Sequence, residues 1–256
     1  MRSLLLASLL LLPAVAMADE PPCKFSADRN LDLDLRDVRS VRFAVNSNDL
    51  HVTGGAASGK GTVRGKACAS DQEALGDLVV TQSKEGDALI VELTNKHNGW
   101  SGFGDHYANL RVEASVPANM PVYVRVGSGD AKARGVQLAE ASVGSGDFEA
   151  RDTTGSFRGK VGSGDMTLEG SGPVQIDTIG SGDFAARRVN GDVRIGSVGS
   201  GEAKLADVTG NVEVGTVGSG DVDVDGVRGN FTVRSLGSGD IDQKGVTGRV
   251  DIPKER

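Results

Sequence analysis

Short runs of the chain alternate between apolar and polar residues, which is the pattern of a β-strand with one buried face. One of the clearest is Leu31-Asp32-Leu33-Asp34-Leu35, and eight such runs precede residue 127. Two of them, residues 78–83 and 88–94, flank a polar turn containing Gly86 and therefore predict a β-hairpin. The eight predicted strands are residues 31–35, 41–45, 50–52, 62–68, 78–83, 88–94, 110–116 and 121–126.

From residue 127 onward, every repeat carries two short alternating runs, too short and too rich in β-branched residues to be helices. Apolar residues recur at matching places of successive repeats, and these columns can be buried only if neighbouring repeats stack. The first-strand column is Ala131, Phe148, Met166, Phe184, Ala203, Val222 and Ile241, and the second-strand column is Phe157, Val174, Val193, Val212, Phe231 and Val250. The first coil is two residues short and fits its second strand poorly. Gly159 stands in a further column that is otherwise Ile or Val, and Gln243 marks the point where the core is expected to fade.

A four-residue phrase, Gly-Ser-Gly-Asp, marks each repeat. It begins at Gly127, Gly144, Gly162, Gly180, Gly218 and Gly237, and a Gly-Ser-Gly-Glu version begins at Gly199. The copies are 17, 18, 18, 19, 19 and 19 residues apart, and a near-constant period indicates one structural unit stacked on itself. We expect each phrase to form a corner, where glycine permits either φ > 0 or close backbone contact between stacked turns.

These patterns predict an all-β fold: a single-stranded parallel β-helix of about seven coils of 17–19 residues. Right-handed crossovers are the rule for parallel strands, so a right-handed β-helix is favoured. A β-rich N-terminal section is expected to begin or cap the same stack. The predicted divisions are a signal peptide at 1–18, an N-terminal segment at 19–39, the β-rich N-terminal part at 40–126 and the repeats at 127–252.

One short helix is expected at residues 71–75, before Gly76. The sequence Ser70-Asp71-Gln72-Glu73 matches a capping box, in which the Ser70 hydroxyl accepts from a first-turn amide and Glu73 reaches back. No other segment of the chain after residue 18 has a convincing helical pattern.

The first 18 residues have the three parts of a secretory signal: Arg2, an apolar run from Leu4 to Leu12, and the small residues Ala16 and Ala18. An uncleaved membrane anchor is the alternative, but the run is shorter than the ~20 apolar residues of a spanning helix. We therefore expect an exported bacterial protein of the periplasm or cell envelope, or a secreted one, with no membrane span in its mature chain.

Charge and cysteine content narrow the function further. Loss of Arg2 with the signal changes the formal charge from −7 to −8. An acidic chain argues against nucleic-acid partners, which require clustered Lys and Arg. Two cysteines in an exported protein predict one disulfide, between Cys23 and Cys68. The sequence has no CxxC motif and no metal-binding spacing, so no metal or other cofactor is expected.

The acid that ends each phrase forms a column: Asp130, Asp147, Asp165, Asp183, Glu202, Asp221 and Asp240. Such a column either binds calcium, as in nonapeptide β-rolls, or caps the glycine turns by accepting local backbone amides. The second interpretation is favoured, because acids ~5 Å apart in water repel by only about 1 kcal/mol. The seven equivalent serines of the phrase have no histidine after His106 to activate them, so they are also predicted to be structural.

The irregular loop before the repeats holds the only tryptophan of the chain. We consider Trp100, Phe103, His106 and Tyr107 a candidate binding loop, because aromatic side chains among glycines and polar residues suit contacts with sugars or proteins. The favoured interpretation, however, is that Trp100, Phe103 and Tyr107 cover one end of the β-helix and protect its exposed strand edge.

The repeats resemble a known family. The segment Leu-Arg-Val-Glu-Ala-Ser-Val-Pro at 110–117, Val-Arg-Val-Gly-Ser-Gly-Asp at 124–130 and the later Val-x-Gly-Asn-Val/Phe-x-Val coils are similar to the bacterial putative-adhesin domains of unknown function. These are β-strand-repeat proteins related to the head domains of auto-transporter adhesins. The resemblance covers roughly residues 40–252, implies binding at the surface or envelope, and carries over no catalytic motif.

The predicted function is therefore non-enzymatic: an adhesin-like envelope or surface protein that binds or supports another macromolecule, either an envelope glycan or a protein. One alternative is a carbohydrate-active β-helix enzyme, although such enzymes place paired carboxylates in a cleft, and the coils here are minimal. Another alternative is a structural module stiffened by calcium.

The inward columns can be tested by burying a charge. Val212→Asp should unfold several coils, because an unpaired buried carboxylate costs several kcal/mol. Thermal melting followed by circular dichroism measures the effect, and an unchanged melting curve would contradict the inward assignment.

Overall fold

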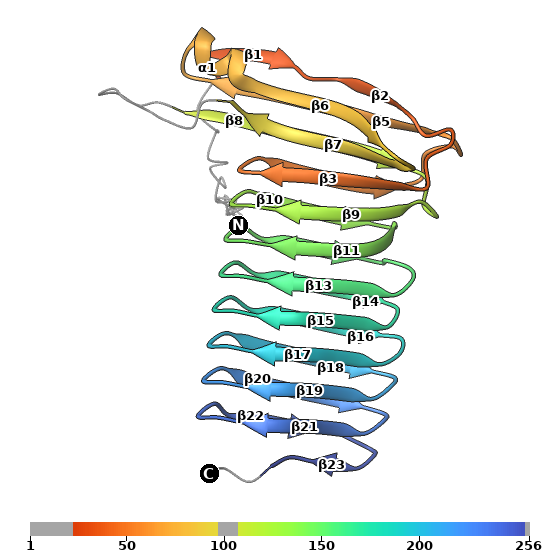
Figure 1. Ribbon diagram of the computed structural model, residues 1–256, viewed down its shortest axis with the longest axis vertical. Helices are drawn as coiled ribbons and strands as arrows, with labels where there is room; N and C mark the ends of the chain where they lie inside the picture. The colour runs from red at the N-terminus through yellow and green to blue at the C-terminus, as the bar shows by residue number, and fades with distance from the viewer. Residues whose placement is uncertain (1–22, 97–106, 254–256) are drawn as a thin grey trace, which may run out of the picture.

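The computed structural model describes residues 23–96 and 107–253, and this part of the chain is almost entirely β-structure. Two β-sheets lie face to face along one long axis, and successive coils add one strand to each sheet (Figure 1). We call the twelve-stranded sheet sheet A and the eleven-stranded sheet sheet B. The predicted all-β parallel β-helix with one short helix is confirmed.

Each repeat supplies a sheet A strand, a corner, a sheet B strand and then the Gly-Ser-Gly corner that leads to the next coil. Neighbouring repeat strands are parallel and in register, so that Phe148, Met166 and Phe184 are adjacent across three strands. In sheet A the repeat strands are β10 (Asp130–Arg134), β12 (Phe148–Arg151), β14 (Met166–Ser171), β16 (Phe184–Val189), β18 (Glu202–Val208), β20 (Asp221–Val227) and β22 (Ile241–Lys244). In sheet B they are β11 (Gln137–Val143), β13 (Phe157–Val161), β15 (Val174–Ile179), β17 (Val193–Val198), β19 (Val212–Val217), β21 (Phe231–Leu236) and β23 (Val250–Asp251).

The part of the chain before the repeats extends the same two sheets. One coil consists of β3 (Ser40–Asn46) and β4 (Asp49–Gly54), and a second consists of β7 (Ala88–Asn95) and β8 (Ala108–Val116). Strand β9 (Pro121–Val126) pairs with β3 and not with β7. Figure 1 accordingly shows β3 between β7 and β9. The β3–β4 coil therefore lies between the β7–β8 coil and the first repeat, although it precedes both in the sequence.

Antiparallel strands close this end of the stack. Strand β5 (Lys60–Ala69) pairs antiparallel with β8, and β1 (Phe25–Asp28) and β2 (Leu31–Asp34) pair antiparallel with β5. Strand β6 (Leu78–Glu85) forms the predicted hairpin with β7. The N-terminal section thus both begins the stack and caps it.

The inward columns fill the space between the sheets. They are buried through the inner coils, with aromatic rings at Phe148, Phe184 and Phe231. Gly159 fits its column poorly because its neighbours occupy the space: a Cβ there would lie 2.7 Å from Ile176 Cδ1 and 2.9 Å from the Phe157 ring. The ring of Phe157 therefore replaces the side chain that Gly159 lacks.

Close contact between stacked corners explains the glycines of the phrase. A Cβ on Gly146 would lie 1.8 Å from the backbone oxygen of Gly129, and a Cβ on Gly182 would lie 1.9 Å from the backbone oxygen of Gly164. None of the phrase glycines, all of which are described, has a positive φ. Of the two expected reasons for glycine, the close approach is therefore the correct one at this corner.

The stack of corners starts one coil earlier than the phrase does. Residues Asn46–Asp49 form the corner of the β3–β4 coil, and the Asp130 amide donates to the Asn48 carbonyl oxygen at 3.1 Å. On the side away from the repeats, this corner lies against β7 instead of another glycine corner, so there is room for the side chains of Asn46 and Asn48. The amide groups of Asn46 and Asn48 donate to the Leu93 carbonyl oxygen at 2.9 and 3.0 Å.

The helix is present, but its predicted cap is wrong. Helix α1 (Gln72–Asp77) continues through Gly76, and its N-cap is Asp71, whose carboxylate accepts from the Ala74 amide at 2.8 Å. The Ser70 hydroxyl donates to Asp71 at 3.1 Å instead of capping the helix itself. A carboxylate is at least as good an N-cap as a hydroxyl, so Asp71 can cap the helix in place of Ser70. Among the described residues, no helix is long and apolar enough to span a membrane.

The contact between corners predicts a large cost for the smallest possible side chain. Gly182→Ala should destabilise the protein by about 3 kcal/mol or more, because the added methyl group collides with backbone that has no alternative position. Ser181→Ala is the matched control, since Ser181 is exposed in the same corner. Urea denaturation of both variants gives the comparison, and equal midpoints would contradict this account of the phrase.

Candidate functional site

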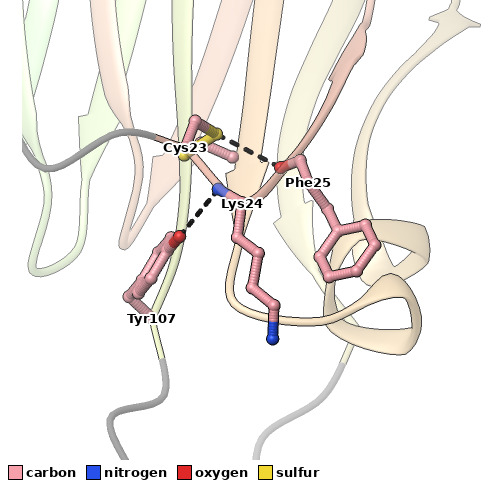
Figure 2. Close-up of a disulfide and its surroundings, with 5 residues drawn as sticks. Cys23, Lys24, Phe25 and Tyr107 are labelled. Atoms are coloured by element: carbon pink, nitrogen blue, oxygen red, sulfur yellow. Dashed lines mark hydrogen bonds between the residues drawn. A yellow bond between two sulfur atoms is a disulfide. The ribbon is translucent and has the colours of Figure 1, made fainter.

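The predicted disulfide joins Cys23 to Cys68 in β5, with 5.6 Å between the Cα atoms. Tyr107 lies beside it (Figure 2). The Tyr107 hydroxyl accepts from the Lys24 amide at 2.9 Å, and its carbonyl oxygen accepts from the Ser70 amide at 2.9 Å. Tyr107 therefore holds together three segments of the capped end, which is a structural role.

The other members of the candidate binding loop, Trp100, Phe103 and His106, lie outside the described residues. Their role as a binding loop or as an end cap stays a prediction. Because backbone amides already occupy the hydroxyl and carbonyl oxygens of Tyr107, the described surface that remains for binding lies on the faces of the two sheets.

The acid column binds coil to coil, which differs from the expected local turn cap. The Asp183 amide donates to Asp165 Oδ1 at 3.0 Å, and the Glu202 amide donates to Asp183 Oδ1 at 3.0 Å. Each accepting carboxylate is thus 17–19 residues from its donor, one coil away. At Glu202 the longer side chain pairs with Lys204, and the Asp221 amide donates to a backbone oxygen instead.

The second corner of the later coils uses the same device. The Asn211 amide donates to Asp192 Oδ1, the Asn230 amide to Asn211 Oδ1 and the Arg249 amide to Asn230 Oδ1, each at 2.9 Å. A short side chain with an acceptor oxygen is sufficient for this bond, which explains why both Asp and Asn occur there. These side chains are therefore structural.

Neither a metal-binding cluster nor a serine–histidine pair is present among the described residues. Within residues 23–96 and 107–253, no group of three or more His, Cys, Asp or Glu side chains could hold a metal ion. His51 is the single histidine of this part, and it is exposed on β4, far in sequence from the seven exposed phrase serines. In the described part, no hydrogen bond joins a phrase serine hydroxyl to a histidine.

The outer face of sheet A is hollowed into a groove of about 710 Å³ that runs from β12 to β22. Its floor is formed where small residues, Thr167, Ala185 and Ala206, stand at outward positions that other coils fill with charged side chains. We call this hollow the sheet A groove. The charged residues that line it are Arg151, Glu169, Arg187, Lys204, Asp223, Asp225, Asp242 and Lys244.

The end of the sheet A groove nearer the cap is rich in arginine. Glu169 there accepts from Arg187 at 2.7 Å and from Arg188 at 2.8 Å, and Arg151 lies 3.7 Å away. The hydrogen bond from Arg187, with a further one from Arg188, lowers the pKa of Glu169. Arg151 also pairs with Glu149. Two carboxylates therefore face three guanidinium groups, and this end of the groove keeps a net positive charge.

The opposite end of the sheet A groove is acidic. Asp223, Asp225 and Asp242 lie on β20 and β22, and Lys204 on β18 is shared with Glu202. Burial raises the pKa of Asp223, and the neighbouring Glu202 and Asp242 carboxylates raise it further. Burial is the larger cause, and the further rise reflects the carboxylates of Glu202 and Asp242 close by, because each like charge disfavours ionisation of the next.

Three other hollows on the described faces of the sheets lack this combination. A groove of about 610 Å³ at the N-terminal part of sheet A is lined by Asp49, His51, Arg111 and Lys132 among others, and its floor is charged. Arg111 pairs with Asp49 at 3.5 Å in this groove. Two smaller hollows on sheet B measure about 280 and 330 Å³. The sheet A groove is the larger one and has the more apolar floor.

Sequence reasoning missed the sheet A groove because its residues alternate correctly as an outer face. The signal that could have found it is a break in the outward columns, where Thr167 and Ala185 follow Lys132 and Glu149. Small residues at consecutive outward positions leave a hollow, which only the register of neighbouring coils makes visible.

No protein-family profile matches the chain, and no curated protein matches its sequence. Solved structures do match it. One is described as a "putative adhesin" from Parabacteroides distasonis, with 16% identity and a TM-score of 0.44 over 90% of this chain and 95% of that one. A "putative adhesin" from Bacteroides fragilis gives 16% and 0.41 over 92% and 99%. A "putative lipid binding protein" from Parabacteroides distasonis gives 11% and 0.40 over 87% and 96%.

The resemblance stated from the repeats is confirmed to this extent: structures described as adhesins are among the structural neighbours. The identities and TM-scores are low, so nothing about ligands is transferred from these proteins. Any ligand of this protein must therefore be inferred from its own residues.

The crowding of carboxylates at the acidic end has a measurable consequence. In a carboxyl NMR titration Asp223 should protonate at a higher pH than an ordinary aspartate, and Glu202→Gln should lower its pKa because one like charge is removed. In the wild-type protein the raised pKa means that the native state binds this proton more tightly than the unfolded chain does. Ionisation of Asp223 therefore reduces the stability of the fold as the pH rises through its pKa. An Asp223 pKa that does not respond to Glu202→Gln would contradict the crowding.

Proposed function

We propose that this chain is a non-enzymatic, exported protein that binds an extended segment of another macromolecule in the sheet A groove. The observation that carries the proposal is the groove itself: an apolar floor of small side chains between a positive and a negative end. The floor lies on paired sheets whose strands and corners are bonded coil to coil. Such a surface is rigid before binding, so little entropy is lost when a partner docks.

The charge pattern favours a polypeptide partner over a neutral glycan. Carboxylates of the partner would meet Arg151 and Arg187, and its basic groups would meet Asp223, Asp225 and Asp242. Complementary charges of this kind fix the direction in which a segment lies and raise its association rate. No aromatic side chain lines the groove, so a sugar ring would find no aromatic face on which to stack.

The proposed location is the periplasm, the cell envelope or the exterior of a bacterium. It is supported by the Cys23–Cys68 disulfide, since such bonds persist in oxidising compartments. The secretory pattern of residues 1–18 points the same way. On this view the chain is cut after Ala18, and its capped end, held by the disulfide, survives outside the cytoplasm.

The groove is tested by filling it. Ala185→Tyr closes the floor without changing the charge, and Thr216→Tyr on the exposed face of β19 in sheet B is the matched control. The labelled proteins are applied to an array of peptides from bacterial envelope proteins and to a glycan array. We expect peptides with an acidic and a basic part to bind, and Ala185→Tyr to weaken them by roughly tenfold or more.

Each other result points elsewhere. Equal loss in both variants would place the binding outside the groove, and binding confined to glycans would overturn the polypeptide assignment. Cleavage of any glycan by the wild-type protein would establish the enzyme that the sequence left as an alternative.

A further inference from the structure

One residue of each repeat has a left-handed backbone conformation, near the end of the sheet A strand. Four of the seven repeats have glycine there, with φ values from 64° to 75°. Glycine adopts such angles without steric cost, because it has no Cβ. These four glycines are Gly135, Gly170, Gly226 and Gly245. The other three repeats have Asp152, Arg188 and Asp207, with φ values of 52°, 56° and 55°.

Arg188 is the exception among these residues. Besides glycine, Asp and Asn enter the left-handed region most readily, because their short polar side chains can bond locally. In the described chain, every non-glycine residue with a positive φ is Asp or Asn apart from Arg188. A long side chain in this region strains the backbone. Strain of this kind persists only where the surrounding contacts hold it, and it is concentrated at functional sites.

The guanidinium group of Arg188 belongs to the positive end of the sheet A groove. Parallel pairing places Glu169 between Arg151 and Arg187 on three neighbouring strands. Arg188 comes directly after Arg187, and its guanidinium donates to Glu169 at 2.8 Å. The position beside Arg188 on β14 is Gly170, which has no side chain to obstruct this contact. The left-handed residue therefore adds a third guanidinium group around one carboxylate.

The three guanidinium groups keep donors for a further acceptor. The side chains of Arg151, Arg187 and Arg188 are 56%, 58% and 53% exposed, whereas that of Glu169 is 18% exposed. A guanidinium has five N–H donors. In the hydrogen bonds of the described residues, Arg187 and Arg188 each use one, and both donate to Glu169. Glu169 therefore holds the guanidinium groups together from the less exposed side and leaves their outer edges open to solvent.

We infer that Arg151, Arg187 and Arg188 form a subsite for a carboxylate of the partner polypeptide, and that Arg188 is held in its strained conformation for this contact. The inference rests on the proposed binding of a polypeptide in the sheet A groove. Arginine matches a carboxylate through two parallel N–H···O bonds. The cluster has two carboxylates, Glu149 and Glu169, for three guanidinium groups, so a carboxylate of the partner balances its charge.

Strain at a contact residue predicts opposite effects of one substitution on stability and on binding. Arg188→Gly introduces the residue that four other repeats have at this position, so it should raise the melting temperature by roughly 2 °C or more. The same change removes one guanidinium group from the subsite, so it should weaken the binding of an acidic segment by roughly threefold or more. An arginine that served the fold alone would give a lower melting temperature and unchanged binding.

The test uses a probe peptide in which a run of glutamates is joined through alanines and serines to a run of lysines. A matched peptide has glutamines in place of the glutamates. Fluorescence anisotropy measures the binding of both peptides to the disulfide-bonded protein at low ionic strength, where exposed charges are least screened. Arg188→Gly should weaken the glutamate probe but add nothing to the loss that the glutamines cause, because effects at one shared contact do not add. Arg188→Lys keeps the charge and should retain part of the affinity.

Arg194→Gln is the matched control for charge. Arg194 is exposed on β17 of sheet B, in the same repeat as Arg188, so this substitution removes one positive charge from the opposite face. It should leave the binding of the glutamate probe unchanged. Differential scanning calorimetry gives the melting temperature of every variant and shows that each is folded.

Three results would overturn the inference: a lower melting temperature of Arg188→Gly, unchanged binding of the glutamate probe by this variant, or additive losses from Arg188→Gly and from the glutamines. If Ala185→Tyr abolishes binding of the probe and Arg188→Gly does not, the subsite is wrong and the groove stands. If the wild-type protein binds neither peptide, the subsite and the polypeptide assignment of the groove are both wrong.

Discussion

The spacing between stacked coils is the constraint on which this structure depends. Neighbouring strands are ~4.8 Å apart, and at this spacing the corner that joins sheet B to sheet A has no room for a Cβ. A Cβ added to Gly146, for example, would lie 1.8 Å from the backbone oxygen of Gly129. Glycine at that place brings the Asp that follows within reach of the next coil, where its carboxylate accepts an amide hydrogen. The Gly-Ser-Gly-Asp phrase is therefore one device that combines spacing with bonding between coils.

Much of the fold was predictable because it is written in local patterns. The columns, the hairpin and the disulfide followed from period-two alternation, a turn and two cysteines, which need no knowledge of distant contacts. The turn at Asn46–Asp49 was expected, but its match to the phrase corners was missed because it has Asn where the phrase has Gly. Its equivalence depends on what lies beyond it, namely the Leu93 carbonyl oxygen of β7. The N-cap was missed because two adjacent residues could each cap α1, and only the backbone decides between them.

The candidate site was less predictable than the fold. The outward residues of one coil give no hint of a hollow, because Ala185 and Ala206 are ordinary residues for an exposed strand. The hollow arises only when parallel pairing places Thr167 beside Ala185, and Ala206 beside Arg187. The irregular loop drew attention in the sequence because its composition stands out, whereas the regular face of sheet A carries the charge gradient and the groove.

The capped end also bears on how the chain reaches its folded state. Each repeat contacts only its neighbours, 17–19 residues away, so a new coil needs only the coil before it to pair with. The coils nearest the cap are completed by the first half of the chain, and every later coil has a finished template beside it. Within the repeats, a polypeptide that emerges N-terminus first can therefore add one coil at a time, and each repeat strand finds its preceding neighbour already in place.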